Sequence, residues 1–429
     1  MQRILAIFEP SLIAMMFFGF WFATPTRDSW LWLLAGIPVV MVLRWRQAGQ
    51  AWPTSPLNRW LLGLALLGML NVLIAPFNRA PANPLYAYTV IFARIWLGIA
   101  LVWWLVALAK QQQSMVGSLW IAGVICAGML LLATGSTAWT TKSNALTAII
   151  QILPQWGDGL RPLEASSFNP NEIAGALALL TPLAFSLAIW AGIRGKRFPG
   201  VVMALIAGGL LLVTILGQSR FALAGIATAL ILLLPWAFSR WHFRYVLWVC
   251  LLVYSIAQAY IILRPTSAAS PANTLLSDRD SESMNIRFDL WASAVEITRA
   301  YPLTGAGANM YRDGRVRALF PAASYGSPPH AHNAWLQMGA DMGLPGLVIF
   351  LGIQMTLATL LIRTWQQGDP AARVVALGVG GGLLAHTIYS LGDAVPLWDR
   401  LAVMYWLLAG LAAAQYALVT NPTTPVRKQ

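Results

Sequence analysis

The segment PPHAHNAWLQMGADMGLPGLVIFLGIQMTLATLLI, residues 328–362, decides the fold because a polar stretch gives way there to an apolar run long enough to cross a bilayer. Residues 264–332 form the longest polar segment of the chain and contain seven arginines. Two of the four histidines, His330 and His332, stand where the polarity changes. Glycine and proline interrupt helices, so a break is predicted at Gly343-Leu344-Pro345-Gly346. The segment predicts a broken membrane helix with titratable side chains at its edge.

The composition extends this prediction to the whole chain. Of 429 residues, 58% are hydrophobic and 10% are charged, whereas a soluble domain carries about a quarter charged residues. The sequence therefore predicts an all-α polytopic membrane protein of about twelve transmembrane helices. The expected spans lie near 5–24, 29–44, 57–77, 86–109, 115–134, 171–193, 199–217, 220–238, 243–263, 333–362, 371–391 and 400–419.

The positions of the basic residues predict the topology. Arg and Lys cluster in alternate short loops and in the tail Arg427-Lys428, and such loops face the cytoplasm. We therefore expect nine spans in 1–263, a periplasmic loop in 264–332, three spans in 333–419 and a cytoplasmic tail in 420–429. Both termini would be cytoplasmic, in a bacterial inner membrane. The first span contains Glu9-Pro10 and is expected to be retained. Topology accounts for about half of the basic residues behind the net charge of +13, so no nucleic-acid partner is implied.

Two helical features are predicted on the outer side. In 285–301 the apolar residues Ile286, Leu290, Ala294 and Ile297 recur at helical spacing, which predicts an amphipathic helix at the membrane surface. Glu172 follows Pro170 and is expected in the first turn of the sixth span, where a carboxylate complements the helix dipole.

Four outer arginines are candidate anion-binding residues, namely Arg161, Arg220, Arg287 and Arg264. Arginine stays charged and offers a planar fork of donors that matches phosphate oxygens. Each of them alone could instead snorkel or pair with a nearby acid. Together they predict a site that could hold a diphosphate.

His332 is the candidate base of the same region. Asn333 follows it as the expected N-cap of a helix, and a neutral imidazole there could take a proton from an alcohol. A capping or hydrogen-bonding histidine is the alternative. His330 competes for the same role, but extended backbone after Pro329 would point the two rings in opposite directions. We therefore expect only one of them to face the site.

The pair Asp278 and Asp280 has a spacing that can hold a divalent cation. Serines surround it, and the arginines already supply positive charge. We interpret the pair as solvated loop and expect no metal site.

Several of these motifs resemble one family. The resemblance rests on Ser219-Arg220 opening a span, Arg287-x-x-x-Trp291, His332-Asn333-x-x-Leu336 and Gly343-Leu344-Pro345-Gly346. This pattern is similar to the superfamily of O-antigen ligases and polymerases. The twelve-span layout with a large loop before the tenth span is most similar to the O-antigen ligases.

The resemblance implies a GT-C-like glycosyltransferase that needs no cofactor and inverts the anomeric centre. Its donor would be an undecaprenyl-diphosphate-linked polysaccharide, its acceptor lipid A-core, and membrane lipids would surround it. By motif, His332 would be the base, supported by Asn333, and Arg220 and Arg287 would contact the diphosphate. Arg161 corresponds only by its position before Asn169-Pro170-Asn171. The residue types are consistent with these roles, because transfer to an alcohol needs a base and stabilisation of a charged leaving group.

Other functions stay open at this point. An O-antigen polymerase uses the same donor with a lipid-linked acceptor, and a protein O-oligosaccharyltransferase is a related possibility. A transporter of an anion or a lipid-linked sugar would explain the outer arginines without catalysis. It would need a coupling acid deep in the membrane, whereas the candidates Glu9, Asp341, Asp393 and Asp399 mostly lie near span ends.

Overall fold

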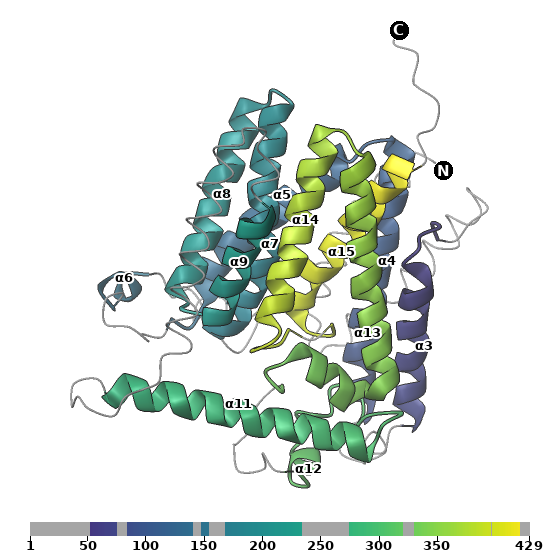
Figure 1. Ribbon diagram of the computed structural model, residues 1–429, viewed down its shortest axis with the longest axis vertical. Coiled ribbons are helices and arrows are strands. Elements are labelled where there is room, and N and C mark those ends of the chain that lie inside the picture. The colour runs from purple at the N-terminus through teal and green to yellow at the C-terminus, as the bar shows by residue number, and fades with distance from the viewer. Residues whose placement is uncertain are drawn as a thin grey trace.

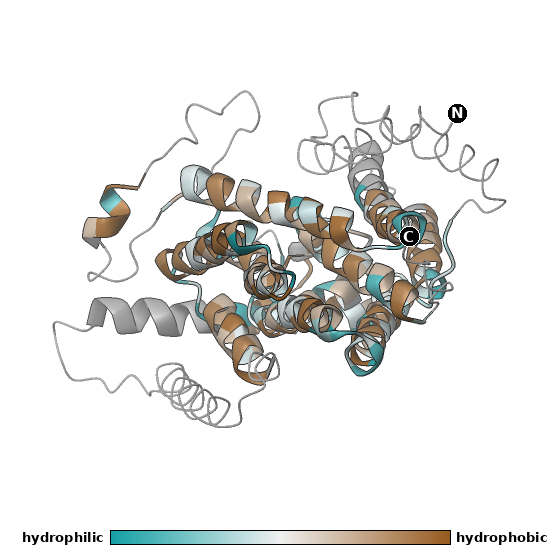
Figure 2. Cartoon of the chain, turned by 90° about the horizontal axis from the view of Figure 1, so that it is seen from above, coloured by the Kyte–Doolittle hydropathy of each residue, from teal (hydrophilic) through white to brown (hydrophobic). Residues whose placement is uncertain are grey.

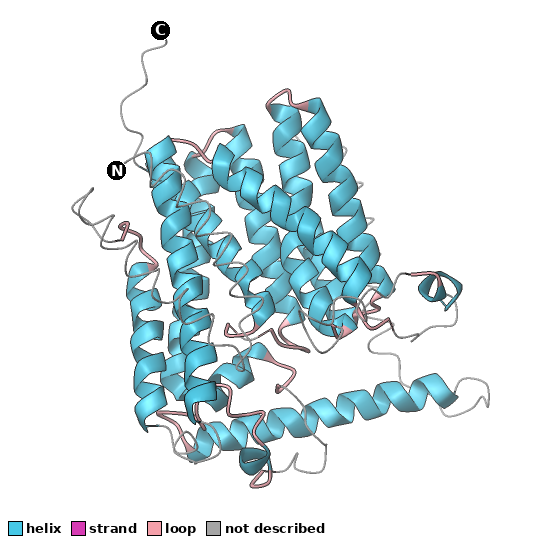
Figure 3. Ribbon diagram, turned by 180° about the vertical axis from the view of Figure 1, so that it is seen from behind, coloured by secondary structure: helices cyan, strands magenta, loops and turns pink. Residues whose placement is uncertain are grey.

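The computed structural model describes residues 52–74, 84–139, 147–153, 168–233, 274–320, 330–395 and 397–420. Within these ranges the regular elements are all helices (Figure 3), and an isolated parallel bridge joins Thr137 to Phe168. The expected all-α architecture is confirmed for this part of the chain. The helices are α3 (Asn58–Ile74), α4 (Pro84–Gln112), α5 (Val116–Ser136), α6 (Thr147–Gln151), α7 (Pro170–Ile193), α8 (Arg197–Leu216), α9 (Arg220–Leu233), α11 (Thr274–Ala300), α12 (Gly314–Arg317), α13 (Ala334–Gln367), α14 (Pro370–Tyr389) and α15 (Val403–Thr420), with a 3₁₀ turn η5 (Arg400–Ala402) before α15.

Seven helices of the described residues are long and apolar enough to cross a membrane. Two shorter helices, α3 and α9, occupy the predicted spans near 57–77 and 220–238. The spans predicted near 5–24, 29–44 and 243–263 lie outside the described residues. The seven long segments are Arg94–Gln112, Val116–Ser136, Pro170–Ile193, Arg197–Leu216, Ala334–Gln367, Pro370–Tyr389 and Arg400–Thr420.

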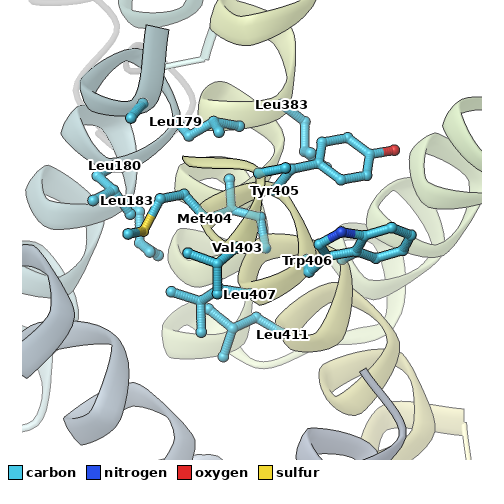
Figure 4. Close-up of a cluster of buried hydrophobic side chains, with 14 of the residues drawn as sticks. Leu179, Leu180, Leu183, Leu383, Val403, Met404, Tyr405, Trp406, Leu407 and Leu411 are labelled. Carbon is cyan, nitrogen blue, oxygen red and sulfur yellow. The ribbon is translucent and has the colours of Figure 1, made fainter. Parts of the chain in front are cut away.

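The core of the bundle lies where α15 packs against α4, α7, α13 and α14. Leucines of α7 and α14 enclose Val403, Met404 and Leu407 of α15 (Figure 4). Small residues let neighbouring helices approach closely, as is common in membranes. A Cβ at Gly382 of α14 would collide with a backbone carbonyl of α7, and one at Gly225 of α9 would collide with α14.

The outer surface of the bundle is apolar. Large hydrophobic side chains such as Val124, Leu205 and Val348 are more than half exposed, and hydrophobic residues, coloured brown, recur along the helices of the bundle (Figure 2). Exposed apolar surface on this scale is expected where lipid surrounds the helices. This exposed apolar surface supports the prediction that the chain is a multi-pass membrane protein.

Helix α13 is broken at the predicted place. Gly343 has φ 68° and ψ −172° inside the helix, a conformation that favours glycine. The N–H of Leu344 donates to the Pro302 carbonyl at 2.8 Å, and a Cβ on Gly343 would overlap the backbone at residues 302–304. The first turns of α13 therefore form a separate short helix tied to the segment that follows α11.

Helix α11 lies across one end of the bundle (Figure 1). Its apolar residues Leu290, Ala294 and Ile297 are fully buried, in a second hydrophobic cluster with Tyr311, Val316, Ala331 and others. A helix is present where one was predicted in 285–301, and it runs from Thr274 to Ala300. Its apolar face packs in this cluster, and its position at the membrane surface stays a prediction. Because Ala331 belongs to this cluster, α11 helps to position the histidines beside it.

Candidate active site

The segment that carries the two histidines is held against the turn after α14. Asn333 caps α13, because its side chain accepts hydrogen bonds from the N–H groups of Trp335 and Leu336, as predicted. Its amide also donates to the Leu391 carbonyl at 3.2 Å, and the Ala334 N–H donates to Ser390 at 3.0 Å. These bonds bring His332 next to Asp393.

A histidine and a carboxylate form the centre of the site. His332 Nδ1 lies 3.1 Å from Asp393 Oδ1, within hydrogen-bond distance. The Asp393 side chain is 4% exposed and that of His332 is 25% exposed. The indole N–H of Trp291 in α11 donates to the His332 carbonyl at 3.3 Å. The imidazole is therefore held at Nδ1, and about a quarter of the side chain stays exposed.

The expectation that the two histidine rings point in opposite directions is wrong. Their ring centroids are 4.4 Å apart in an edge-to-face arrangement, and His330 Nε2 lies 3.7 Å from the same oxygen of Asp393. The reason is the backbone, because His332 has φ 49°, in the left-handed region instead of the extended one. Both rings consequently face the carboxylate.

The hydrogen bonds of His330 fix its tautomer. The N–H of His332 donates to His330 Nδ1 at 3.2 Å, so in the neutral ring the hydrogen resides on Nε2. Burial lowers the pKa of His330 to about 4, although Asp393 opposes the change. His330 is therefore neutral at physiological pH, and its Nε2–H points toward Asp393.

Asp393 is ionised at the same pH. Burial alone would raise its pKa, but the hydrogen bond from His332 and neighbouring positive charge, including that of Arg287, lower it to about 2. The Ala394 N–H also donates to Asp393 Oδ1, at 2.9 Å. The carboxylate thus provides a fixed negative charge behind His332.

These three side chains could hold a cation by spacing alone, because their ligand atoms lie within 4.8 Å of one another. A histidine nitrogen binds a metal through a free lone pair. His330 Nε2 carries a hydrogen in this arrangement, and its Nδ1 already accepts a hydrogen bond. His330 therefore does not fit a metal site while that bond is in place.

Of the four candidate arginines, Arg220 and Arg287 lie in the described residues, and Arg161 and Arg264 lie outside them. The guanidinium of Arg287 is 5.5 Å from the ring of Phe221, the residue after Arg220. Phe221 in turn packs against Gly392, where there is no room for a Cβ. The start of α9, the middle of α11 and the turn that carries Asp393 therefore meet. The interpretation of Asp278 and Asp280 as loop residues is wrong, because both belong to helix α11. Their side chains fall outside the described residues.

A second cluster of acidic and basic side chains lies near the His332–Asp393 pair. Glu172 is in the first turn of α7, as predicted, within electrostatic range of Asp393, Asp399, Arg94 and Arg312. Burial raises the pKa of Asp399, and Arg94 and Arg312 oppose that change. Arg94 also donates to the Trp398 carbonyl at 2.9 Å.

The sequence pattern did not identify the partners of His332. Asp393 was considered only as a coupling acid, and Arg94 and Arg312 were not singled out. Asp393 lies 61 residues from His332 in the chain, so no local spacing could have paired them. A polar residue next to glycine at the end of a predicted span, as in Gly392-Asp393, was the one available signal.

The fold and the site together define a multi-helix membrane protein with a His–Asp pair and arginines gathered at one end of the bundle. Residues 206–351 match the family model described as O-antigen ligase. This match covers Arg220, Arg287, His330 and His332, and it supports membership of the chain in the O-antigen ligase superfamily. No curated protein matches the chain.

Proposed function

We propose that this protein transfers a polysaccharide from undecaprenyl diphosphate to a sugar hydroxyl of lipid A-core. The observation that carries the proposal is the His332–Asp393 pair, at 3.1 Å. His332 lies within residues 206–351, which match the O-antigen ligase family, and Asp393 lies beyond them. The family match supports glycosyl transfer of the ligase or polymerase type. We further propose an inner-membrane protein of twelve spans and GT-C-like fold, with the site facing the periplasm.

His332 is the proposed general base. Asp393 accepts the hydrogen of Nδ1, which leaves the lone pair of Nε2 free for the acceptor hydroxyl. As the acceptor oxygen bonds to the anomeric carbon, the bond from that carbon to the diphosphate oxygen breaks and the hydroxyl proton moves to His332. Asp393 then stabilises the imidazolium, as a buried carboxylate does in other base–carboxylate pairs. A single displacement of this kind inverts the anomeric centre.

Arg220 and Arg287 are the proposed contacts of the leaving diphosphate. The start of α9 and the middle of α11 meet at Phe221, and this contact supports the proposal that both arginines bind one ligand beside Asp393. Charge-assisted, two-pronged hydrogen bonds to phosphate would offset the charge that develops on the leaving group. Arg161, which precedes α7, is proposed as a third contact. No step in this scheme requires a metal or another cofactor.

A reconstituted transfer assay tests the proposal. Purified protein in liposomes would receive lipid-linked polysaccharide and lipid A-core, and the products would be separated by gel electrophoresis. A ladder of glycosylated lipid A-core is expected with wild-type protein. Longer chains on undecaprenyl diphosphate without acceptor modification would indicate a polymerase, and movement of the lipid-linked sugar without transfer would indicate a transporter.

The His332→Ala variant is the accompanying test of the base. Loss of a general base costs about 10²–10⁴ in rate, while binding of undecaprenyl diphosphate should persist because the arginines remain. His330→Ala is the matched control, since it removes the neighbouring ring. If His330→Ala is inactive and His332→Ala is normal, His330 is the base.

A further inference from the structure

Arg312 is a charged residue beside the site that the scheme above does not use. It is exposed and lies between the fully buried Tyr311 and Asp313, the N-cap of α12. Three residues on, Arg315 pairs with Asp313 at 2.6 Å. Among the described residues, no acid lies within the 4.0 Å ion-pair distance of Arg312.

A buried chain of hydrogen bonds connects Arg312 to the histidines. The Ala331 N–H donates to Gln337 Oε1 at 2.7 Å, and the Gln337 amide donates to Asp341 Oδ2 at 2.5 Å. The other oxygen of Asp341 accepts the Tyr311 N–H at 2.8 Å. Ala331 separates the two histidines and Tyr311 precedes Arg312, so these bonds fix the backbone of Arg312 relative to His332.

Packing reinforces this connection. Tyr311 and Ala331 belong to the same buried cluster under α11, and the Tyr311 hydroxyl donates to the Leu290 carbonyl at 2.9 Å. An ordinary surface arginine can move with its loop, but the backbone on the N-terminal side of Arg312 is held by the core. Its position relative to the site is therefore built into the fold.

Arg287 contributes positive charge near Asp393, and Arg312 contributes positive charge near Glu172 and Asp399. His330 is within electrostatic range of both arginines. Neither carboxylate is ion-paired with Arg312 within 4.0 Å. A ligand that suits this side carries an anionic group for the guanidinium.

We propose that Arg312 binds an anionic substituent, such as a phosphate, on the acceptor glycan. This inference rests on the proposed function, in which Arg220 and Arg287 take the donor diphosphate. The acceptor hydroxyl must reach His332, so the acceptor approaches the base from the side that the donor leaves open. Arg312 then selects acidic acceptors over neutral ones of the same sugar sequence.

The test compares Arg312→Ala with the matched control Arg315→Ala, which alters an arginine of the same segment that is already paired. Each variant would be assayed with phosphorylated lipid A-core and with the same acceptor after removal of its phosphates. Arg312→Ala should raise the KM for the phosphorylated acceptor about tenfold or more, the loss expected for one hydrogen bond to a charged group. Its kcat and its KM for the donor should stay near wild type, and Arg312→Lys should recover part of the loss. Arg315→Ala should behave as wild type.

Three outcomes would overturn the inference. They are an unchanged acceptor KM in Arg312→Ala, an equal loss with the dephosphorylated acceptor, and an effect on the donor KM or on binding of undecaprenyl diphosphate. The last would assign Arg312 to the donor. Direct binding of the phosphorylated acceptor, measured without donor, keeps this test separate from the proposed function. If wild-type protein transfers nothing but Arg312→Ala weakens acceptor binding, the proposed function fails and the anion site stands.

Discussion

Replacing Asp393 by asparagine separates the charge of this side chain from its geometry. Asp393 Oδ1 accepts the Ala394 N–H at 2.9 Å as well as the hydrogen on His332 Nδ1. In Asp393→Asn the Ala394 N–H selects the amide oxygen for this position, because an amide nitrogen cannot accept a hydrogen bond. His332 should therefore keep its tautomer and lose only the negative charge behind it.

The size of the effect follows from the buried carboxylate. Burial opposes ionisation of Asp393, yet the hydrogen bond from His332 and nearby positive charge bring its pKa to about 2. The fall from an ordinary aspartate pKa corresponds to about 2–3 kcal/mol. With the side chain 4% exposed, solvent screens little of this energy. Only part of it belongs to His332, so we expect transfer to slow about tenfold to hundredfold.

The assay is the rate of transfer at saturating donor and acceptor. Without the carboxylate, the imidazolium that forms during transfer is less stable, so the rate should fall. Asp369→Asn is the matched control. Asp369 caps α14 with an exposed side chain, and asparagine caps a helix equally well. A normal rate in Asp393→Asn would show that Asp393 only braces its turn.

Three further predictions concern charge around the site. Arg220→Lys and Arg287→Lys should each transfer far more slowly than the wild-type protein, because an ammonium lacks the planar fork of donors. The double variant should lose less activity than the product of the two single losses. Near-normal rates in both lysine variants would show that these side chains only snorkel. Transfer should persist in excess EDTA, and a loss restored by magnesium would instead support a cation at Asp278 and Asp280. Burial holds the pKa of His330 at about 4, whereas an unfolded histidine protonates near pH 6.5, so acidification from pH 7 to pH 5 should cost about 2 kcal/mol of stability. His330→Asn should remove most of that loss in thermal unfolding, and an unchanged pH dependence would contradict it.

Helix positions were largely predictable because they depend on local properties of the chain. The span predicted at 171–193 is α7 at Pro170–Ile193, where Asn169 caps the helix and Pro170 occupies its first turn. The break in α13 was predictable for the same reason, since Gly343 and Pro345 mark it in the sequence. The segments 5–24, 29–44 and 243–263 were predicted as spans on the same grounds and lie outside the described residues.

The inner arrangement of the site was not predictable, because it depends on contacts between distant segments. His332 was singled out by its place before a capping asparagine. Nothing in the sequence indicates its φ of 49°, since the left-handed conformation is uncommon outside glycine. That one dihedral angle turns both rings toward Asp393, and it invalidates a rule of alternation that holds only for extended backbone.

Asp341 is an acid within a predicted span for which the structure supports a structural role and not a transport role. An acid within a membrane span is a functional candidate by default, and Asp341 was accordingly weighed as a coupling acid of a transporter. Its two oxygens accept hydrogen bonds from the Tyr311 N–H and the Gln337 amide. A transported ion would have to break these bonds and release the segment on which Arg312 stands. The acid is better explained as the anchor that ties that segment to α13, and this explanation removes one reason for choosing a transporter over an enzyme.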